Sequence, residues 1–120
     1  SRKSLYEKTL IKRGATIGAN ATILCGYTLG CYCFIGAGAV VTKDIPDYGL
    51  VSGNPGKLSG YMSRHGHKLA FNNTGRAICP ESNFVYEKVE DQVRCLDLNE
   101  DEPLPSELSF GSLSYDSFKR

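Results

Sequence analysis

The chain has 120 residues, of which 41% are hydrophobic and 22% are charged, so it suits one folded domain and is too apolar for a fully disordered protein. The sequence holds no run of 18 apolar residues that would predict a membrane-spanning helix, and no basic segment before an apolar one as in a signal peptide. The net charge of +1 argues against general nucleic-acid binding.

Charge is unevenly distributed along the chain. Residues 1–46 carry 6 basic and 2 acidic side chains, whereas residues 89–120 carry 3 and 8. A mildly basic body with an acidic tail suits a small anionic ligand, and the alternative is an ordinary solvated surface.

The five cysteines form an odd number without a secretion signal, which indicates reduced thiols and a cytoplasmic protein. The chain begins at Ser1 and its single methionine is Met62. We therefore expect a processed chain or a part of a longer one.

Residues 11–46 contain a six-residue repeat. Large aliphatic residues recur at every sixth position, namely Ile11, Ile17, Ile23, Leu29, Ile35 and Val41. The fifth position of each hexad is mostly small. A helix requires spacings of three and four residues and tolerates glycine poorly, and simple strand alternation has no period of six. The pattern therefore predicts a parallel β-helix, with one short strand and one corner per hexad.

Three hexads make one triangular coil, and successive coils stack about 4.8 Å apart, as neighbouring strands do. The predicted register pairs residues 18 positions apart: Ile11 with Leu29, Ile17 with Ile35, and Ile23 with Val41. Two coils are fewer than the roughly three units that repeat folds need for a continuous core. We therefore expect the start of the chain to dock on earlier coils or on partner subunits.

The repeat is followed by turns and a predicted helix. Residues 44–49 and 53–56 are expected turns on either side of a last short strand. Residues 57–69 predict a short helix, because apolar or amphipathic side chains share one helical face: Leu58, Tyr61, Met62, His65 and Leu69.

Residues 76–96 predict a small hairpin, since short apolar runs alternate with polar turns. The remainder is acidic and contains prolines, which predicts an extended tail. The predicted organisation is an initial segment, the repeat, a helix with a hairpin, and an acidic tail, over residues 1–10, 11–56, 57–96 and 97–120.

Three segments together resemble a known family. Residues 36–44 (GAGAVVTKD) resemble the closing coil of hexapeptide-repeat acyltransferases, and residues 51–57 (VSGNPGK) resemble the loop after their coils. The segments GHKL at 66–69 and GRAICPES at 75–82 are similar to a narrower group. Its members acetylate the 3-amino group of UDP-2-acetamido-3-amino-2,3-dideoxyglucuronate in surface-polysaccharide synthesis.

The resemblance extends over about residues 5–96 of this chain, which correspond to the C-terminal part of the family's longer chains. It implies an all-β fold, a left-handed parallel β-helix, assembled as a homotrimer. It also implies acetyl-CoA in the groove between adjacent subunits and a nucleotide-sugar acceptor, much of whose site lies on earlier coils. The sequence assigns no catalytic residue. Gly56 stands where the family usually has Ala, and we expect this change to loosen the loop.

The cofactor-binding residues that the resemblance implies are Gly36, Ala37, Gly38, Ala39, Thr42, Lys43, Gly53, Pro55 and Lys57. Small residues let an extended pantetheine arm approach the backbone and pair with a coil edge, although they also suit a tight coil by itself. Lysines supply charge-assisted donors to phosphates, the alternative being ordinary solvated lysines. Arg64 is a further candidate for the phosphates, and Tyr48 for a contact with the adenine.

Histidines and cysteines are weaker candidates. We expect His65 to pack on the predicted helix and His67 to cap its end, rather than to act as a base or metal ligands. The repeats contain no histidine, so we expect no zinc site and no metal. Cys33 is expected inside the coils and Cys31 at a corner, and no pKa-lowering group for a nucleophile is evident.

These features predict an acetyl-CoA-dependent N-acetyltransferase that acts on the amino group of a nucleotide-linked sugar. Two alternatives remain open. One is another sugar O- or N-acetyltransferase of the same superfamily, and the other is a non-catalytic trimerising β-helix without affinity for the cofactor.

Overall fold

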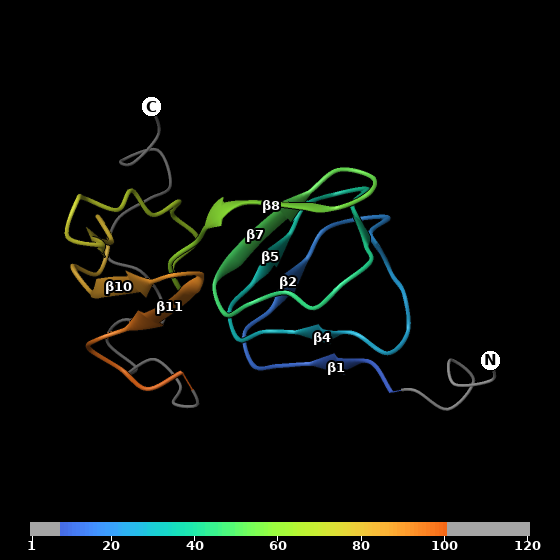
Figure 1. The fold of residues 1–120 in the computed structure, drawn as a ribbon, viewed down its shortest axis with the longest axis horizontal. Helices are drawn as coiled ribbons and strands as arrows, with labels where there is room; N and C mark the ends of the chain where they lie inside the picture. Colours follow the sequence, from blue (N-terminus) through green and yellow to red (C-terminus); the bar gives the residue numbers. More distant parts are fainter. Residues whose placement is uncertain (1–7, 101–120) are drawn as a thin grey trace.

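The structure is a computed structural model that describes residues 8–100. Two units lie side by side, a stack of short parallel strands and a small antiparallel sheet (Figure 1). The regular elements of residues 8–100 are all β-strands. None of these residues forms a helix long and apolar enough to cross a membrane. Most of the predicted initial segment, and the predicted acidic tail beyond residue 100, lie outside the described residues.

The repeat region forms the predicted stacked coils, which we call the prism. Its strands contain two residues each: β1 (Leu10–Ile11), β2 (Thr16–Ile17), β3 (Thr22–Ile23), β4 (Thr28–Leu29), β5 (Phe34–Ile35) and β6 (Val40–Val41). Strands β1, β2 and β3 each pair in parallel with the strand three further along the chain. The three predicted aliphatic pairs are confirmed, because each inward residue meets the residue 18 positions later.

A third, shorter coil follows the two regular ones. Ile45 forms a bridge with Leu29, and β7 (Gly49–Ser52) pairs with β5 at a separation of 16 residues instead of 18. Asp44 and Asp47 each use Oδ1 to accept a backbone N–H of the coil below, at 2.8 and 2.7 Å. The segment predicted as a terminating turn therefore continues the prism, with carboxylates as hydrogen-bond acceptors.

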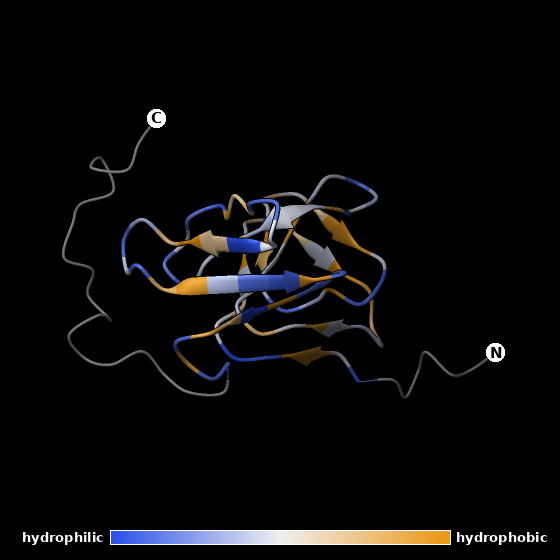
Figure 2. Cartoon of the chain, turned by 60° about the vertical axis from the view of Figure 1, so that its left-hand side comes forward, coloured by the Kyte–Doolittle hydropathy of each residue, from blue (hydrophilic) through white to orange (hydrophobic). Residues whose placement is uncertain are grey.

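Burial in the prism changes sharply from one end to the other. Leu29, Ile35 and Val51 are fully buried in its core. At the opposite end, Ile11 and Ile17 point inward but remain 47% and 40% exposed. Apolar β1 lies at the lower edge of the prism (Figure 2). Each fully buried aliphatic side chain contributes about 1.5–3 kcal/mol, so the upper coils carry most of the stabilisation.

The corners of the prism use left-handed backbone. Gly14, Tyr32 and Tyr48 have φ of 75°, 58° and 64° at one corner, where the Tyr32 and Tyr48 rings stack at 5.6 Å. Asn20 and Gly38 have φ of 61° and 71° at another, in agreement with the stacking expected from their spacing. We call these the Tyr32–Tyr48 corner and the Gly36–Gly38 corner. Strand β5 runs between them.

The predicted helix over 57–69 is wrong. Strand β8 (Lys57–Tyr61) pairs antiparallel with β7, with an irregularity between Leu50 and Val51. The exposed edge of β7 offers backbone partners at once, whereas a helix here would contain Gly60, which costs about 1 kcal/mol relative to alanine. The spacing of three from Leu58 to Tyr61 fits a helix, but in the strand Tyr61 is buried and Leu58 is exposed.

The second unit is a three-stranded antiparallel sheet in the order β11-β10-β9. It consists of β9 (Arg76–Ile78), β10 (Val85–Val89) and β11 (Gln92–Cys95). The hairpin expected within 76–96 is therefore present, with β9 as an additional strand. Its buried side chains form one cluster with residues of the prism and of the connecting segment: Tyr48, Tyr61, Leu69, Ala77, Cys79, Tyr86, Val93 and Cys95.

Candidate functional site

The structure brings two of the predicted cofactor-binding segments together at the Gly36–Gly38 corner. The N–H of Gly36 donates to Val51 at 2.8 Å, and the N–H of Val40 donates to Gly53 at 2.9 Å. Ala37, Gly38, Gly53 and Pro55 are all exposed there. The corner is thus an open shelf of small residues, which lies beside the loop after the coils.

The backbone of this corner is mostly engaged within the prism. The N–H of Gly38 donates to Ala19 at 2.9 Å, and the N–H of Ala39 donates to Gly36 at 3.1 Å. Ala39 is also among the predicted cofactor-binding residues, but its side chain is fully buried and packs in the core of the prism. A Cβ at Gly38 would meet nothing within 4 Å. The corner therefore offers close approach to the backbone rather than a row of free N–H donors.

Gly56 does not loosen the loop, contrary to the expectation from sequence. Its N–H donates to the carbonyl of Val40 at 2.7 Å, and the residue is buried. A Cβ at this position would lie 2.7 Å from the same carbonyl oxygen. The absence of a side chain lets the loop lie directly on β6, so glycine tightens the contact.

The two predicted lysines lie on different sides of the shelf. Lys57 begins β8 opposite Ser52, next to the loop, and its side chain is exposed. Thr42 and Lys43 follow the end of β6, one prism face away from the Gly36–Gly38 corner. Lys43 lines a cavity of about 430 Å³ together with Pro46 and Leu58.

A cluster of phenols around one guanidinium occupies the Tyr32–Tyr48 corner. Arg64 donates to the Tyr48 and Tyr32 hydroxyls, at 3.2 Å each, and its guanidinium lies 4.3 Å from the centre of the Tyr32 ring. Tyr48 donates to Glu100 at 2.9 Å, and Tyr86 accepts the N–H of Arg64 at 3.0 Å. The sequence-based roles for Arg64 at phosphates and Tyr48 at adenine do not fit, because Arg64 serves this cluster and Tyr48 is fully buried.

Burial sets the protonation of the groups in this region. It raises the pKa of the Tyr48 and Tyr86 hydroxyls well above their ordinary value. Burial, with a smaller contribution from Asp47, also raises the pKa of the Cys33 thiol to about 12. A thiol that stays protonated is a poor nucleophile, so Cys33 acts as a core residue, as its hexad position predicts.

The histidines pack against the antiparallel sheet and its loops. His65 meets Phe84 edge to face, at 6.0 Å between ring centres. His67 Nε2 lies 3.1 Å from a Glu81 oxygen. The predicted roles of His65, packing on a helix, and of His67, capping its end, are wrong because residues 57–69 do not form a helix. Within residues 8–100, no three His, Cys, Asp or Glu side chains are grouped to hold a metal ion.

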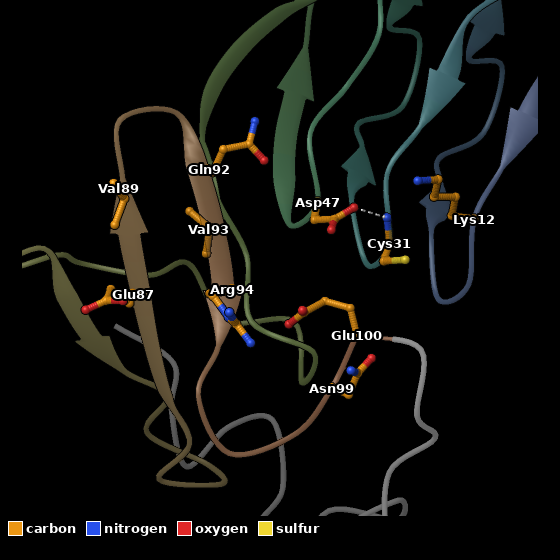
Figure 3. Close-up of a pocket in the computed structure, with 10 residues that line it drawn as sticks. All are labelled: Lys12, Cys31, Asp47, Glu87, Val89, Gln92, Val93, Arg94, Asn99 and Glu100. Carbon is orange, nitrogen blue, oxygen red and sulfur yellow. Dashed lines mark hydrogen bonds between the residues drawn. The ribbon is translucent and has the colours of Figure 1, made fainter.

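Sequence reasoning missed a cleft of about 450 Å³ between the two units (Figure 3). Lys12, Cys31 and Asp47 line it from the prism, and Arg94 lines it from the hairpin, close to Glu100. Asp47 already accepts the N–H of Cys31, and Glu100 accepts that of Cys95. Only tertiary packing unites these residues, so no sequence motif could have identified them.

Comparisons with known proteins now bear on this arrangement. No protein-family model matches the chain. The dTDP-3-amino-3,6-dideoxy-alpha-D-galactopyranose 3-N-acetyltransferase of Aneurinibacillus thermoaerophilus is 46% identical over 74 residues, 62% of this chain and 38% of that protein. Serine acetyltransferase 2 of Arabidopsis thaliana is 40% identical over 60 residues, 50% of this chain and 19% of that protein.

Among solved structures, a hexapeptide-repeat-containing acetyltransferase of Vibrio cholerae, complexed with acetyl-coenzyme A, matches with a TM-score of 0.46 and 30% identity. This match covers 48% of the present chain and 31% of the other. The chain thus spans at most 38% of the length of these three proteins. The predicted resemblance to hexapeptide-repeat acetyltransferases is confirmed by the sequence relatives.

Proposed function

We propose that this chain is the donor-binding part of an N-acetyltransferase that moves acetyl from acetyl-CoA to the amino group of a nucleotide-linked sugar. The observation that carries the proposal is the 46% identity over 74 residues to an enzyme named for the 3-N-acetylation of a dTDP-linked amino sugar. The group expected from sequence acetylates the 3-amino group of a UDP-linked sugar. The relative and the group expected from sequence point to one acceptor class, a 3-amino sugar linked to a nucleoside diphosphate.

The reaction is an acyl transfer. The amine nitrogen bonds to the thioester carbonyl carbon, the carbon–sulfur bond breaks, the thiolate leaves and the nitrogen loses one proton. The described residues act in this scheme by binding and orienting the donor. Ala37 and Gly38 let an extended amide-rich arm lie against the prism, since neither presents a large side chain. Lys57, and Lys43 one face away, provide charges for its phosphates.

The assembly belongs to the same proposal. We place the donor in a groove between adjacent copies of a homotrimer of left-handed β-helices. The open shelf supports this arrangement, because Ala37, Gly38, Gly53 and Pro55 form one exposed wall of a site and a neighbouring copy can supply the other.

Calorimetric titration of the purified chain with acetyl-CoA tests the proposal. We expect saturable binding near one site per chain, with the trimer measured independently by light scattering. Lys57→Ala should weaken binding about threefold to tenfold, because an exposed charge-assisted hydrogen bond contributes modestly. Lys12→Ala removes another exposed lysine, outside the shelf, and is the matched control. A trimer without measurable affinity would instead support the non-catalytic β-helix.

The relative that acetylates serine favours a second possibility, an acetyltransferase with another acceptor. A panel of serine, free amino sugars and nucleotide-linked 3-amino sugars separates the two. Acetylation of serine alone would overturn the proposed acceptor class and leave the donor site intact.

A further inference from the structure

A second cavity, of about 250 Å³, lies at the Tyr32–Tyr48 corner. Thr16 and Phe34 line it from the outer face of β2 and β5, and Tyr32 lines it from the corner. Met62, Arg64 and His65 close the other side. The cavity has one apolar aromatic wall, several hydroxyl and nitrogen groups, and no carboxylate among its lining residues.

The wall formed by residues 62–66 is held rigidly. The buried Ser63 hydroxyl accepts the N–H groups of His65 and His67, at 3.3 and 3.2 Å. The N–H of Gly66 donates to Ser63 at 3.0 Å. Arg64 is fixed by the phenol cluster described above. A cavity whose polar groups are positioned in advance loses little entropy when it binds a ligand.

The lining identifies the class of ligand. The Phe34 ring offers a surface on which a flat ring can stack, and the hydroxyl groups of the lining offer donors for carbonyl oxygens. The absence of carboxylates from the lining distinguishes this cavity from the cleft in Figure 3, where Asp47, Glu87 and Glu100 are unfavourable for an anionic ligand. A volume below the roughly 300–1,000 Å³ of drug-sized sites fits one small ring rather than a whole nucleotide sugar.

We propose that this cavity binds the pyrimidine base of the acceptor nucleotide. The inference rests on the proposed function, which makes the acceptor a nucleotide-linked sugar. The cavity and the donor shelf lie at the two ends of β5, since Tyr32 precedes this strand and Gly36 follows it. Four residues of strand span about 13 Å, a distance that the ribose and the diphosphate of a nucleotide sugar cross together in extended form. A base in the cavity thus directs the sugar toward the shelf.

Calorimetric titrations with UDP, thymidine diphosphate and GDP test the inference, each paired with acetyl-CoA on the same protein. We expect at least one pyrimidine nucleotide to bind more tightly than GDP. Phe34→Ala should weaken that binding about fivefold or more, the effect of losing a base–aromatic stack, and leave the acetyl-CoA affinity unchanged.

Thr16→Val provides a second, milder variant that removes one hydroxyl from the cavity. Thr22→Val is its matched control, because Thr22 is also exposed and occupies the same hexad position on another face. We expect the first substitution alone to weaken pyrimidine nucleotide binding. This comparison holds even if Phe34→Ala proves unstable.

The paired donor titration separates the two proposals. If the wild-type protein binds acetyl-CoA but neither pyrimidine nucleotide, the base site is overturned and the donor site stands. The same conclusion follows if the Phe34→Ala variant binds the pyrimidine nucleotides as tightly as the wild type does. Protein that binds neither acetyl-CoA nor nucleotides overturns the proposed function and this inference with it.

Discussion

The two units of this chain are both built from strands, but they are specified in different ways. In the two regular coils of the prism, one inward aliphatic residue in every hexad sets the register of the strand pairs, so Ile17 meets Ile35 by spacing alone. Where the antiparallel unit joins the prism, Tyr86 accepts the N–H of Arg64, and Tyr48 of the prism donates to Glu100, 52 residues away. A periodic core is encoded locally, whereas the junction of the two units depends on polar contacts between distant segments.

The largest effect should come from the prism core. Ile35→Ala removes a fully buried side chain and should lower the free energy of unfolding by about 2–5 kcal/mol. Ile17→Ala removes the same atoms from its stacking partner, which is 40% exposed, and should cost clearly less. Chemical denaturation of both variants provides the measurement. Equal losses would mean that the lower end of the prism is buried in solution.

The second-largest effect should come from alkaline pH, which should lower the free energy of unfolding through the buried tyrosines at the junction of the two units. The pKa of Tyr48 and Tyr86 is raised in the folded chain by burial, so stability is fully present below the ordinary tyrosine pKa of about 10. As pH rises above that value, the unfolded state loses these protons first. The free energy of unfolding should then fall by about 1.4 kcal/mol per pH unit for each tyrosine. Urea denaturation between pH 9 and 11 tests this slope, and a flat profile would contradict it.

A smaller effect should follow from the loss of a single hydroxyl. Tyr48→Phe keeps the ring that stacks on Tyr32 but removes the partner of Arg64 and Glu100, which should cost about 1–2 kcal/mol. It should also reduce the alkaline slope by about 1.4 kcal/mol per pH unit, the contribution of one buried tyrosine. Tyr27→Phe in the prism, at a half-buried tyrosine outside the cluster, is the matched control and should leave the free energy of unfolding at neutral pH unchanged. A variant as stable as wild type would show that shape alone holds the junction.

The two parts of the candidate site also differ in whether the sequence could predict them. The resemblance of two segments to family motifs predicted the residues of the shelf, and the structure brings Gly36, Gly38 and Gly53 to one corner. The cavity at the other corner was not identified. It combines Phe34 with a turn nearly 30 residues further along the chain, and no spacing in the sequence links the two segments.

The misplaced helix has a related cause. Residues 57–69 carry apolar side chains at spacings that a helix also uses, and sequence alone does not show that β7 has an unpaired edge nearby. Once β7 is in place, Lys57 to Tyr61 gain backbone partners along that edge. An available strand edge thus outweighed a weak helical periodicity interrupted by Gly60.

By itself, the sequence determined the stacked coils, their register and the resemblance to hexapeptide-repeat acetyltransferases, because a repeat of large and small residues leaves one way to bury its aliphatic positions. Tertiary structure alone decided that β8 pairs with β7, that Gly56 lies against Val40, and that Arg64 joins the two units. These contacts connect segments without periodicity, and their energies depend on burial and hydrogen-bond geometry that form only when the distant segments have packed.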